Sequence, residues 1–588
     1  MSDAWRDIAK RKQDERDAKI PKEWQLSSES SPDQNTLLEI PRRCGILNQN
    51  ELEITGQYDA TALLEKLSRK ELRSVDVVTA FCKRAAIAHQ VTNCLTEIFF
   101  PQAIARAKAL DAYIAKHAKP VGPLHGLPIS LKDSFSIPGI DSSVGVTSLV
   151  FKPSSSPSNL VPILLNAGAV LYCKTNIPQT LMALDSMNHV FGRTINPSSP
   201  RLTPGGSTGG EGALIAMRGS VLGVGTDIGG SIRIPAMCNG LYGIKPSVGR
   251  VPYGGQESLT QEGSGRVGLQ ASAGPLATSL RDCEMFLNII AEAQPWNSDI
   301  DCIPGPIYPS SNSNSSNSPL RIGIMHTDGT TNPLPPIASF LHSISNTLRA
   351  SATSLFEVHD LPITLVTKPL QSLTNNLLYT DGGQYKFSKL SSTGEPTIPW
   401  VEQRMKPSPP KSLEQVRALH ERREKAAADF LKVWSGEYGS SQSATSNEPQ
   451  DWTTIGLENR AKSKPLDAII CPIAPHPVPE IERWNATGYT AMWVLLDYPA
   501  GFLPVRRFTY QDTLLEIPEG QKVIGSWDRV NRELWDRNKV DRNVYVGSCL
   551  GCQVVVPRLQ EGKLCRVMGL LEEALKPLRE EEGQRAKL

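Results

Sequence analysis

Leu127-Pro-Ile-Ser-Leu-Lys-Asp133 is a short apolar run that ends in a lysine, and two glycine-rich segments follow it along the chain. Pro204-Gly-Gly-Ser-Thr-Gly-Gly-Glu-Gly212 contains Ser207, and Gly225-Thr-Asp-Ile-Gly-Gly-Ser-Ile-Arg-Ile-Pro235 contains Ser231. An apolar run leading into a glycine-rich turn is typical of a buried strand followed by a tight loop. A buried lysine beside two loop serines can form a nucleophilic centre that needs neither a histidine nor a metal ion.

The sequence around these segments alternates between short apolar runs and stretches with helical spacing. Short apolar runs at 127–131, 169–173 and 221–224 are interleaved with helix-like stretches at 160–167 and 211–218. This alternation predicts an α/β fold with a mostly buried, mixed sheet flanked by helices. Helical spacing also marks 59–90 in two pieces, with Ser74 as the N-cap of the second, and further elements are expected as helices at 101–117 and 412–434 and as strands at 321–325, 466–472 and 553–557.

No internal repeat and no clean linker divides the 588 residues. We expect one large domain, with a helical region (1–120) packed on a core (121–300) and a C-terminal part (321–588) that completes the substrate pocket. Two polar stretches, 301–320 and 436–452, are rich in Ser, Asn or Gln and are predicted to be flexible insertions.

Composition excludes several classes of partner. The net charge is +2 with 21% charged and 39% apolar residues, which gives no reason to expect a nucleic-acid or membrane-surface ligand. No apolar run approaches the roughly 18 residues needed to cross a bilayer, and the charged N-terminus lacks a secretory signal. A cytoplasmic location is the default. The C-terminal Ala-Lys-Leu588 resembles a peroxisomal address and provides the alternative.

The eleven cysteines are scattered and odd in number, as expected for reduced thiols inside a cell. Cys549 and Cys552 form a C-x-x-C without a second pair or a histidine at ligand spacing. Zinc binding is therefore poorly supported, and we predict no metal and no cofactor.

Lys132 could activate a serine only in its neutral form. Its pKa would have to fall by about three units from about 10.4, and burial beneath the apolar run is the kind of desolvation that lowers a lysine pKa so far. Asp133 would oppose this fall if it were close. Neighbouring side chains on a strand point to opposite faces, so we expect Asp133 to face away. The alternative is a lysine held in a salt bridge at a strand edge.

Ser231 follows two glycines, which let successive backbone N–H groups turn into one concavity. The amides of Ile228, Gly229, Gly230 and Ser231 are therefore candidates for an oxyanion hole. The alternative for this segment is a tight turn with a capping serine.

Ser207 admits a competing interpretation. Gly205-x-Ser207-x-Gly209 also fits the nucleophile elbow of α/β-hydrolases, where Ser207 would attack with help from a histidine. His359, His420 or His476 could supply that base, although none has a distinctive setting and this hypothesis leaves Lys132 and Ser231 unexplained. The segment lacks the lysine of a phosphate-binding loop, so nucleotide binding is not supported.

Residues 122–255 resemble the core of the amidase signature family, with its lysine and two serines in the family's order. The resemblance implies that Ser231 is the acylated nucleophile, that Lys132 is the base, and that Ser207, after a cis Gly206–Ser207 peptide, carries protons between them. It also implies that Thr208, Asp227 and Arg233 support this centre. Thr208 replaces a serine of the family pattern but keeps the hydroxyl.

The segments 44–47 with 53–55, 81–90, 174–182 and 248–253 are similar to the fungal acetamidase-type branch. The resemblance implies an amide hydrolase that cleaves small carboxamides to carboxylate and ammonia. A fatty-acid or aryl amide hydrolase of the same family is the alternative, and an α/β-hydrolase-type esterase using Ser207 is a weaker one. The expected partners are a small-molecule amide and, as an option, a second copy of the chain in a homodimer.

Overall fold

A computed structural model describes residues 4–27, 37–261, 263–308, 318–351, 355–362, 369–436, 464–483 and 487–579. Most of the two expected insertions (309–317 and 437–452) and the C-terminal Ala-Lys-Leu lie outside the described residues.

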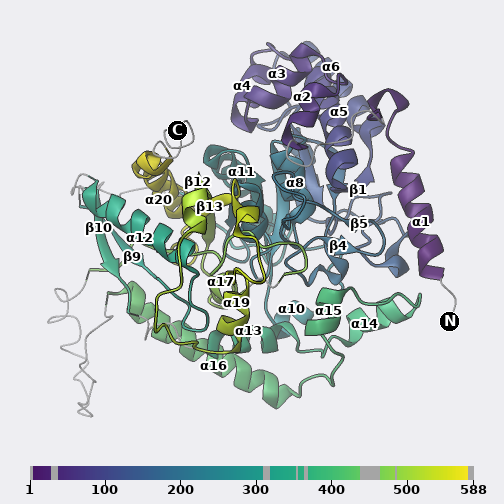
Figure 1. Ribbon diagram of the computed structural model, residues 1–588. Coiled ribbons are helices and arrows are strands. Elements are labelled where there is room, and N and C mark those ends of the chain that lie inside the picture. Colours follow the sequence, from purple (N-terminus) through teal and green to yellow (C-terminus); the bar gives the residue numbers. More distant parts are fainter. Residues whose placement is uncertain are drawn as a thin grey trace, which may run out of the picture.

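The apolar runs form one eleven-stranded mixed sheet, in the order β1-β3-β2-β6-β8-β7-β12-β13-β11-β9-β10 (Figure 1). The strands are β1 Leu95–Ile98, β2 Pro128–Lys132, β3 Val170–Thr175, β6 Leu222–Asp227, β7 Tyr242–Lys245, β8 Ser272–Ala277, β9 Leu320–Ile324, β10 Phe356–Asp360, β11 Ala468–Cys471, β12 Ala500–Arg507 and β13 Cys549–Val555. A separate pair joins β4 Met187–Asn188 to β5 Gly192–Arg193. The predicted α/β fold with a large mixed sheet is confirmed.

Helices cover this sheet. They are α1 Ala4–Asp17, α2 Ile40–Arg43, α3 Gln49–Gln57, α4 Ala60–Ser68, α5 Ser74–Thr92, α6 Phe100–His117, α7 Leu160–Asn166, α8 Gly209–Ala216, α9 Arg233–Asn239, α10 Ser264–Val267, α11 Leu280–Glu292, α12 Pro335–Ala350, α13 Pro369–Leu378, α14 Gln384–Ser391, α15 Pro399–Arg404, α16 Leu413–Trp434, α17 Gly488–Leu495, α18 Tyr510–Thr513, α19 Ser526–Glu533 and α20 Glu561–Ala574. Figure 1 shows α2 to α6 grouped at the top and α13 to α16 along the bottom.

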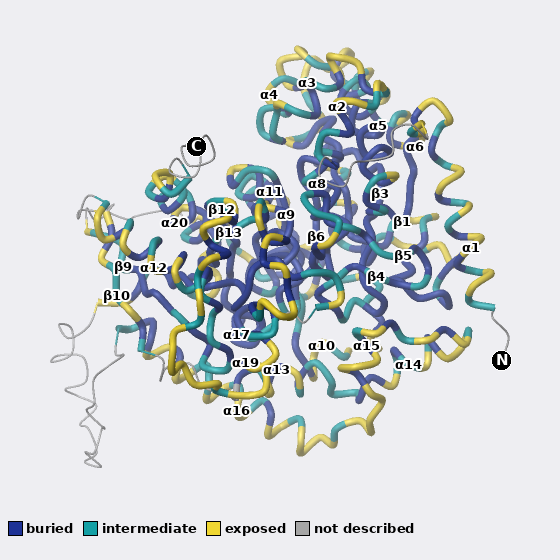
Figure 2. The backbone as a smooth tube through the Cα atoms, viewed as in Figure 1, coloured by how far each residue is buried: buried dark blue, intermediate teal, exposed yellow. Residues whose placement is uncertain are grey.

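Burial follows the sheet. Every residue of β2, β3 and β6 is buried, as expected for strands that lie between helical layers. The outer turns of α3, α4 and α16 are exposed in Figure 2, while the central strands run through the buried interior and the edge strand β10 is partly exposed. The centre of the sheet is therefore a water-poor place for any polar side chain.

One local prediction is wrong. The helix α5 begins at Ser74, but no side chain of its own N-cap residue, Arg73, satisfies its first amides. The carboxylate of Asp111, on α6, accepts hydrogen bonds from the amides of Ser74 (2.7 Å) and Val75 (3.0 Å) instead. Asp111, which is distant in sequence, thus caps the N-terminus of α5 in place of the predicted cap, Ser74.

Candidate active site

Lys132 is the last residue of β2, which lies between the parallel strands β3 and β6. Its side chain is fully buried, and its Nζ donates to Ser207 Oγ at 2.7 Å, Thr226 Oγ1 at 2.8 Å and Thr208 Oγ1 at 3.0 Å. Three hydroxyl oxygens therefore match the three protons of an ammonium group. No carboxylate among the described residues forms an ion pair with Lys132, so the salt-bridge alternative is not supported.

Burial lowers the pKa of Lys132 to about 7, although the carboxylates of Asp227 and Glu211 oppose this shift. The neutral amine is therefore well populated near neutral pH. Asp133 faces away, as expected: its carboxylate accepts from Thr96 Oγ1 at 2.7 Å and from the amide of Val144 at 2.8 Å.

Ser207 lies in the loop before α8 and is reached through a cis Gly206–Ser207 peptide bond, as the resemblance implied. A Cβ added at Gly206 would lie 2.4 Å from the carbonyl oxygen of Asp185, so only glycine fits there. Among the described residues no hydrogen bond joins Ser207 to Ser231, although both line one cavity. The transfer between the two serines stays a prediction.

The loop after β6 presents Ser231 and the candidate oxyanion amides. Asp227 Oδ1 accepts from the amide of Gly230 at 2.7 Å, and Oδ2 accepts from that of Ile232 at 3.2 Å. The amide of Gly230 is thus already bonded within the loop. Within the described part of the chain, the amides of Ile228, Gly229 and Ser231 have no such acceptor, which leaves these three of the four predicted donors able to face a ligand.

Arg233 and Asp227 are both fully buried and form a bidentate pair, with two N–O distances of 2.9 Å. Burial alone would raise the pKa of Asp227, but Arg233 more than offsets this and lowers it. The carboxylate is thereby kept charged and able to hold the loop amides. The supporting role of Asp227 and Arg233 in catalysis stays a prediction.

Sequence reasoning missed two residues that hold this loop from the C-terminal half. Thr490, on α17, donates its hydroxyl to the carbonyl of Gly229 at 2.6 Å, and Gln553, on β13, accepts from Arg233 Nη1 at 2.5 Å. Both side chains are fully buried. No motif marks them, because their contacts with the loop reach across more than 250 residues of chain.

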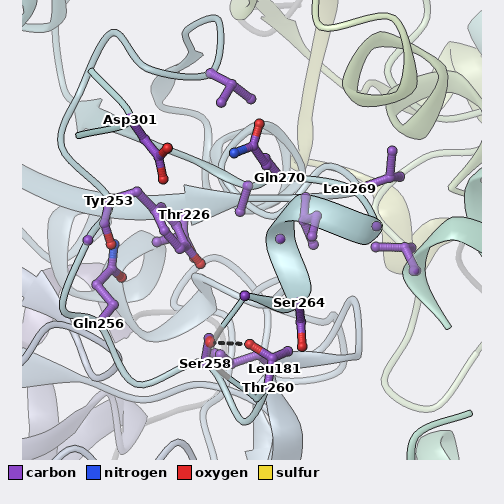
Figure 3. Close-up of a pocket in the computed structure, with 18 of the residues that line it drawn as sticks. Leu181, Thr226, Tyr253, Gln256, Ser258, Thr260, Ser264, Leu269, Gln270 and Asp301 are labelled. Carbon is purple, nitrogen blue, oxygen red and sulfur yellow. Dashed lines mark hydrogen bonds between the residues drawn. The ribbon is translucent and has the colours of Figure 1, made fainter. Parts of the chain in front are cut away.

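Two cavities meet at Ser231. One, of about 330 Å³, is lined by Ser207, Thr226 and Ser231 together with polar side chains such as Gln256, Gln270 and Asp301. Figure 3 shows these polar side chains with Leu181 and Leu269, and with the short helix α10 that carries Ser264.

The second cavity, of about 600 Å³, is lined by Ser231 and Gly229 and by apolar and aromatic side chains that include Met182, Trp400 and Trp527. Leu181, Met182, Ile228, Ser231 and Leu378 are common to both cavities.

Of the histidines proposed for the nucleophile-elbow hypothesis, one is on an outer strand and two have backbone carbonyl oxygens as neighbours. His359 is on β10, the edge strand at the end of the sheet remote from β2. The ring of His420 lies 3.2 Å from the carbonyl oxygen of Val267, and that of His476 lies 2.7 Å from the carbonyl oxygen of Pro477. The side chain that contacts Ser207 is Lys132, which argues against that hypothesis.

Within the described ranges, no three His, Cys, Asp or Glu side chains gather where they could hold a metal ion, and no disulfide bond is present. None of the described helices is both long enough and apolar enough to cross a membrane.

Comparison with known proteins gives matches over nearly the whole chain. The family model described as Amidase matches residues 76–565. The chain is 36% identical over 569 residues to an acetamidase of Aspergillus oryzae, covering 95% of this chain and 97% of that protein. It is 35% identical over 591 residues to an acetamidase of Emericella nidulans, covering 98% and 99%. Among solved structures, a fatty acid amide hydrolase is similar with a TM-score of 0.79 and 27% identity, covering 96% of this chain and 95% of that one.

Proposed function

The chain belongs to the amidase signature family, and on this premise we propose that it hydrolyses carboxamides to a carboxylate and ammonia through an acyl-enzyme on Ser231. The observation that carries the proposal is the contact between Lys132 Nζ and Ser207 Oγ, 2.7 Å long and fully buried, together with the lowered lysine pKa. Without a neutral amine in that position a serine hydroxyl is a poor nucleophile.

In the proposed mechanism Ser231 Oγ attacks the amide carbonyl carbon. Its proton passes to Ser207 Oγ as the proton of Ser207 passes to neutral Lys132. The amides of Ile228, Gly229 and Ser231 hold the resulting oxyanion. When the tetrahedral adduct collapses, the C–N bond breaks and the protonated lysine returns its proton, through Ser207, to the departing nitrogen.

Hydrolysis of the acyl-enzyme repeats the same steps with water in place of the serine. Water attacks the ester carbonyl and loses a proton towards Lys132. Ser231 then leaves and recovers its own proton from the relay. Every proton is returned, so the proposed cycle needs no cofactor.

The nature of the acyl group is the next question. The two acetamidases support short aliphatic amides as substrates. The cavity of about 600 Å³, with Met182, Trp400 and Trp527 on its walls, supports aryl or longer acyl groups as a second candidate. Steady-state release of ammonia from acetamide, butyramide, benzamide and a long-chain amide tests both. If the enzyme hydrolyses none of these four amides, the proposed function is refuted.

A further inference from the structure

Lys386 is a buried lysine that the proposed mechanism does not use. It lies in the first turn of α14, is 7% exposed, and lines the same cavity as Ser207 and Ser231. Among the described residues none forms a hydrogen bond or an ion pair with its Nζ. An ammonium group in such a place is unusual, because buried charges in proteins are normally paired.

The carboxylates around this cavity are already satisfied by other partners. Asp299 accepts from the amides of Tyr253, Gly254 and Asp301 at 2.9–3.1 Å. Asp301 forms an ion pair with Arg266, and Asp381 accepts from the amide of Gly383 at 2.9 Å. Among the described lining residues, these three carboxylates therefore have protein partners, whereas Lys386 forms neither an ion pair nor a hydrogen bond.

The energetics of Lys386 favour an incoming anion. Burial lowers the pKa of Lys386, and Asp381 is the carboxylate that opposes this shift. The partial positive charge at the start of α14, close to Lys386, also favours a bound anion. A carboxylate within hydrogen-bond distance would favour the charged lysine and form a charge-assisted bond with a side chain that is largely buried.

We propose that Lys386 binds a carboxylate at the far end of the substrate, so that the preferred amides are those that carry a second, anionic group. This inference rests on the proposed function, because it places the scissile amide at Ser231 and the carboxylate at Lys386. Monoamides of short dicarboxylic acids are the simplest compounds with this chemistry.

The test compares the monoamides of succinic, glutaric and adipic acid with the neutral amides of the same chain length. For at least one length, wild type should show a KM about tenfold lower for the anionic amide, which corresponds to about 1.4 kcal/mol. Lys386→Met should remove that difference by raising KM for the anionic amide, with kcat and the neutral amides changed less than about twofold.

Lys389→Met is the matched control. Lys389 belongs to the same helix but stacks on the ring of Tyr385, 5.0 Å from its centroid, and does not line the cavity. This variant removes the same charge from the same helix and should leave the preference for anionic amides intact. Loss of the preference in both variants would show a general effect of charge and would overturn the proposal.

Two failures can be told apart. If neutral amides are cleaved while no anionic amide is preferred, or if Lys386→Met keeps the preference, the inference is wrong and the proposed function stands. If no amide is cleaved, the proposed function fails, and calorimetric binding of the dicarboxylates themselves still tests the site. Wild type should then bind the best dicarboxylate about tenfold more tightly than Lys386→Met, and equal binding would overturn the inference.

Discussion

The segment 127–235 and the C-terminal half of the chain contribute to one centre in different ways. The first supplies Lys132 at the end of β2, Ser207 in the loop before α8 and Ser231 in the loop after β6. The second supplies single side chains, such as Thr490 and Lys386, from helices that carry no recognisable pattern. The proposed reacting groups thus come from local sequence, whereas the positioning of the loop and the lining of the cavities depend on long-range packing.

The largest expected effect tests the first region. Lys132→Ala should lower kcat by about 10²–10⁴-fold, since the base is lost. Lys132→Arg should be nearly as damaging, because a guanidinium stays protonated. The measurement is kcat beside the melting temperature for both variants. An active, well-folded arginine variant would mean that Lys132 serves only as a structural cation.

The second region is tested at Thr490. Thr490→Val keeps the shape but removes the donor to the carbonyl of Gly229, so the oxyanion loop loses a restraint. We expect kcat to fall about 10- to 100-fold with little change in KM, because small misplacements of reacting groups are costly.

Thr374→Val is the matched control for Thr490. Thr374 is also fully buried, on α13, but its hydroxyl donates to the carbonyl of Leu370 in its own helix. The Thr374→Val variant should leave kcat unchanged. Equal losses of kcat in the two variants would contradict a specific role of the Thr490 hydroxyl in positioning the loop.

The pH dependence of activity tests whether Lys132 or the neighbouring Glu211 is the titrating group. Lys132 must lose a proton to act, so kcat/KM should rise about tenfold between pH 6 and 8 and level off above, as a pKa of about 7 requires. Burial also raises the pKa of Glu211 to about 7, against its bonds to Ser130 and Thr175. Glu211→Gln should keep the rise. Its disappearance in that variant would assign the titration to Glu211 instead of Lys132.

The smallest effect is expected far from both regions. Asp111→Ala removes the acceptor for the first amides of α5 and should lower the free energy of unfolding by about 1 kcal/mol without changing kcat. Denaturant unfolding and the standard amide assay measure the two quantities. A large loss of kcat here would show that activity depends on distant helices as much as on the loops.

Much of the fold could be predicted because the strands near 127–131, 169–173 and 221–224 are continuous apolar runs with turn residues between them. The site motifs could be found for a related reason: glycines, serines and a lysine are concentrated in a few short segments. Asp111, Thr490 and Gln553 could not be found in this way. Each acts through hydrogen bonds to partners distant in sequence, and a single Asp, Thr or Gln leaves no periodic signal.

The hydrogen-bond partners of the charged site residues also could not be predicted from the sequence. A fall in the pKa of Lys132 was predicted from burial, but not the three hydroxyls that surround its Nζ. The bond between Asp227 and the amide of Gly230 was likewise invisible, and it removes one amide from the predicted oxyanion set.

The most direct test of the account is to locate the nucleophile by covalent labelling. Wild-type enzyme treated with a fluorophosphonate and digested for mass spectrometry should carry the adduct on Ser231, and Ser231→Ala should be unlabelled and inactive while remaining folded. An adduct on Ser207, with Ser231→Ala still active, would contradict the assignment of Ser231, Ser207 and Lys132.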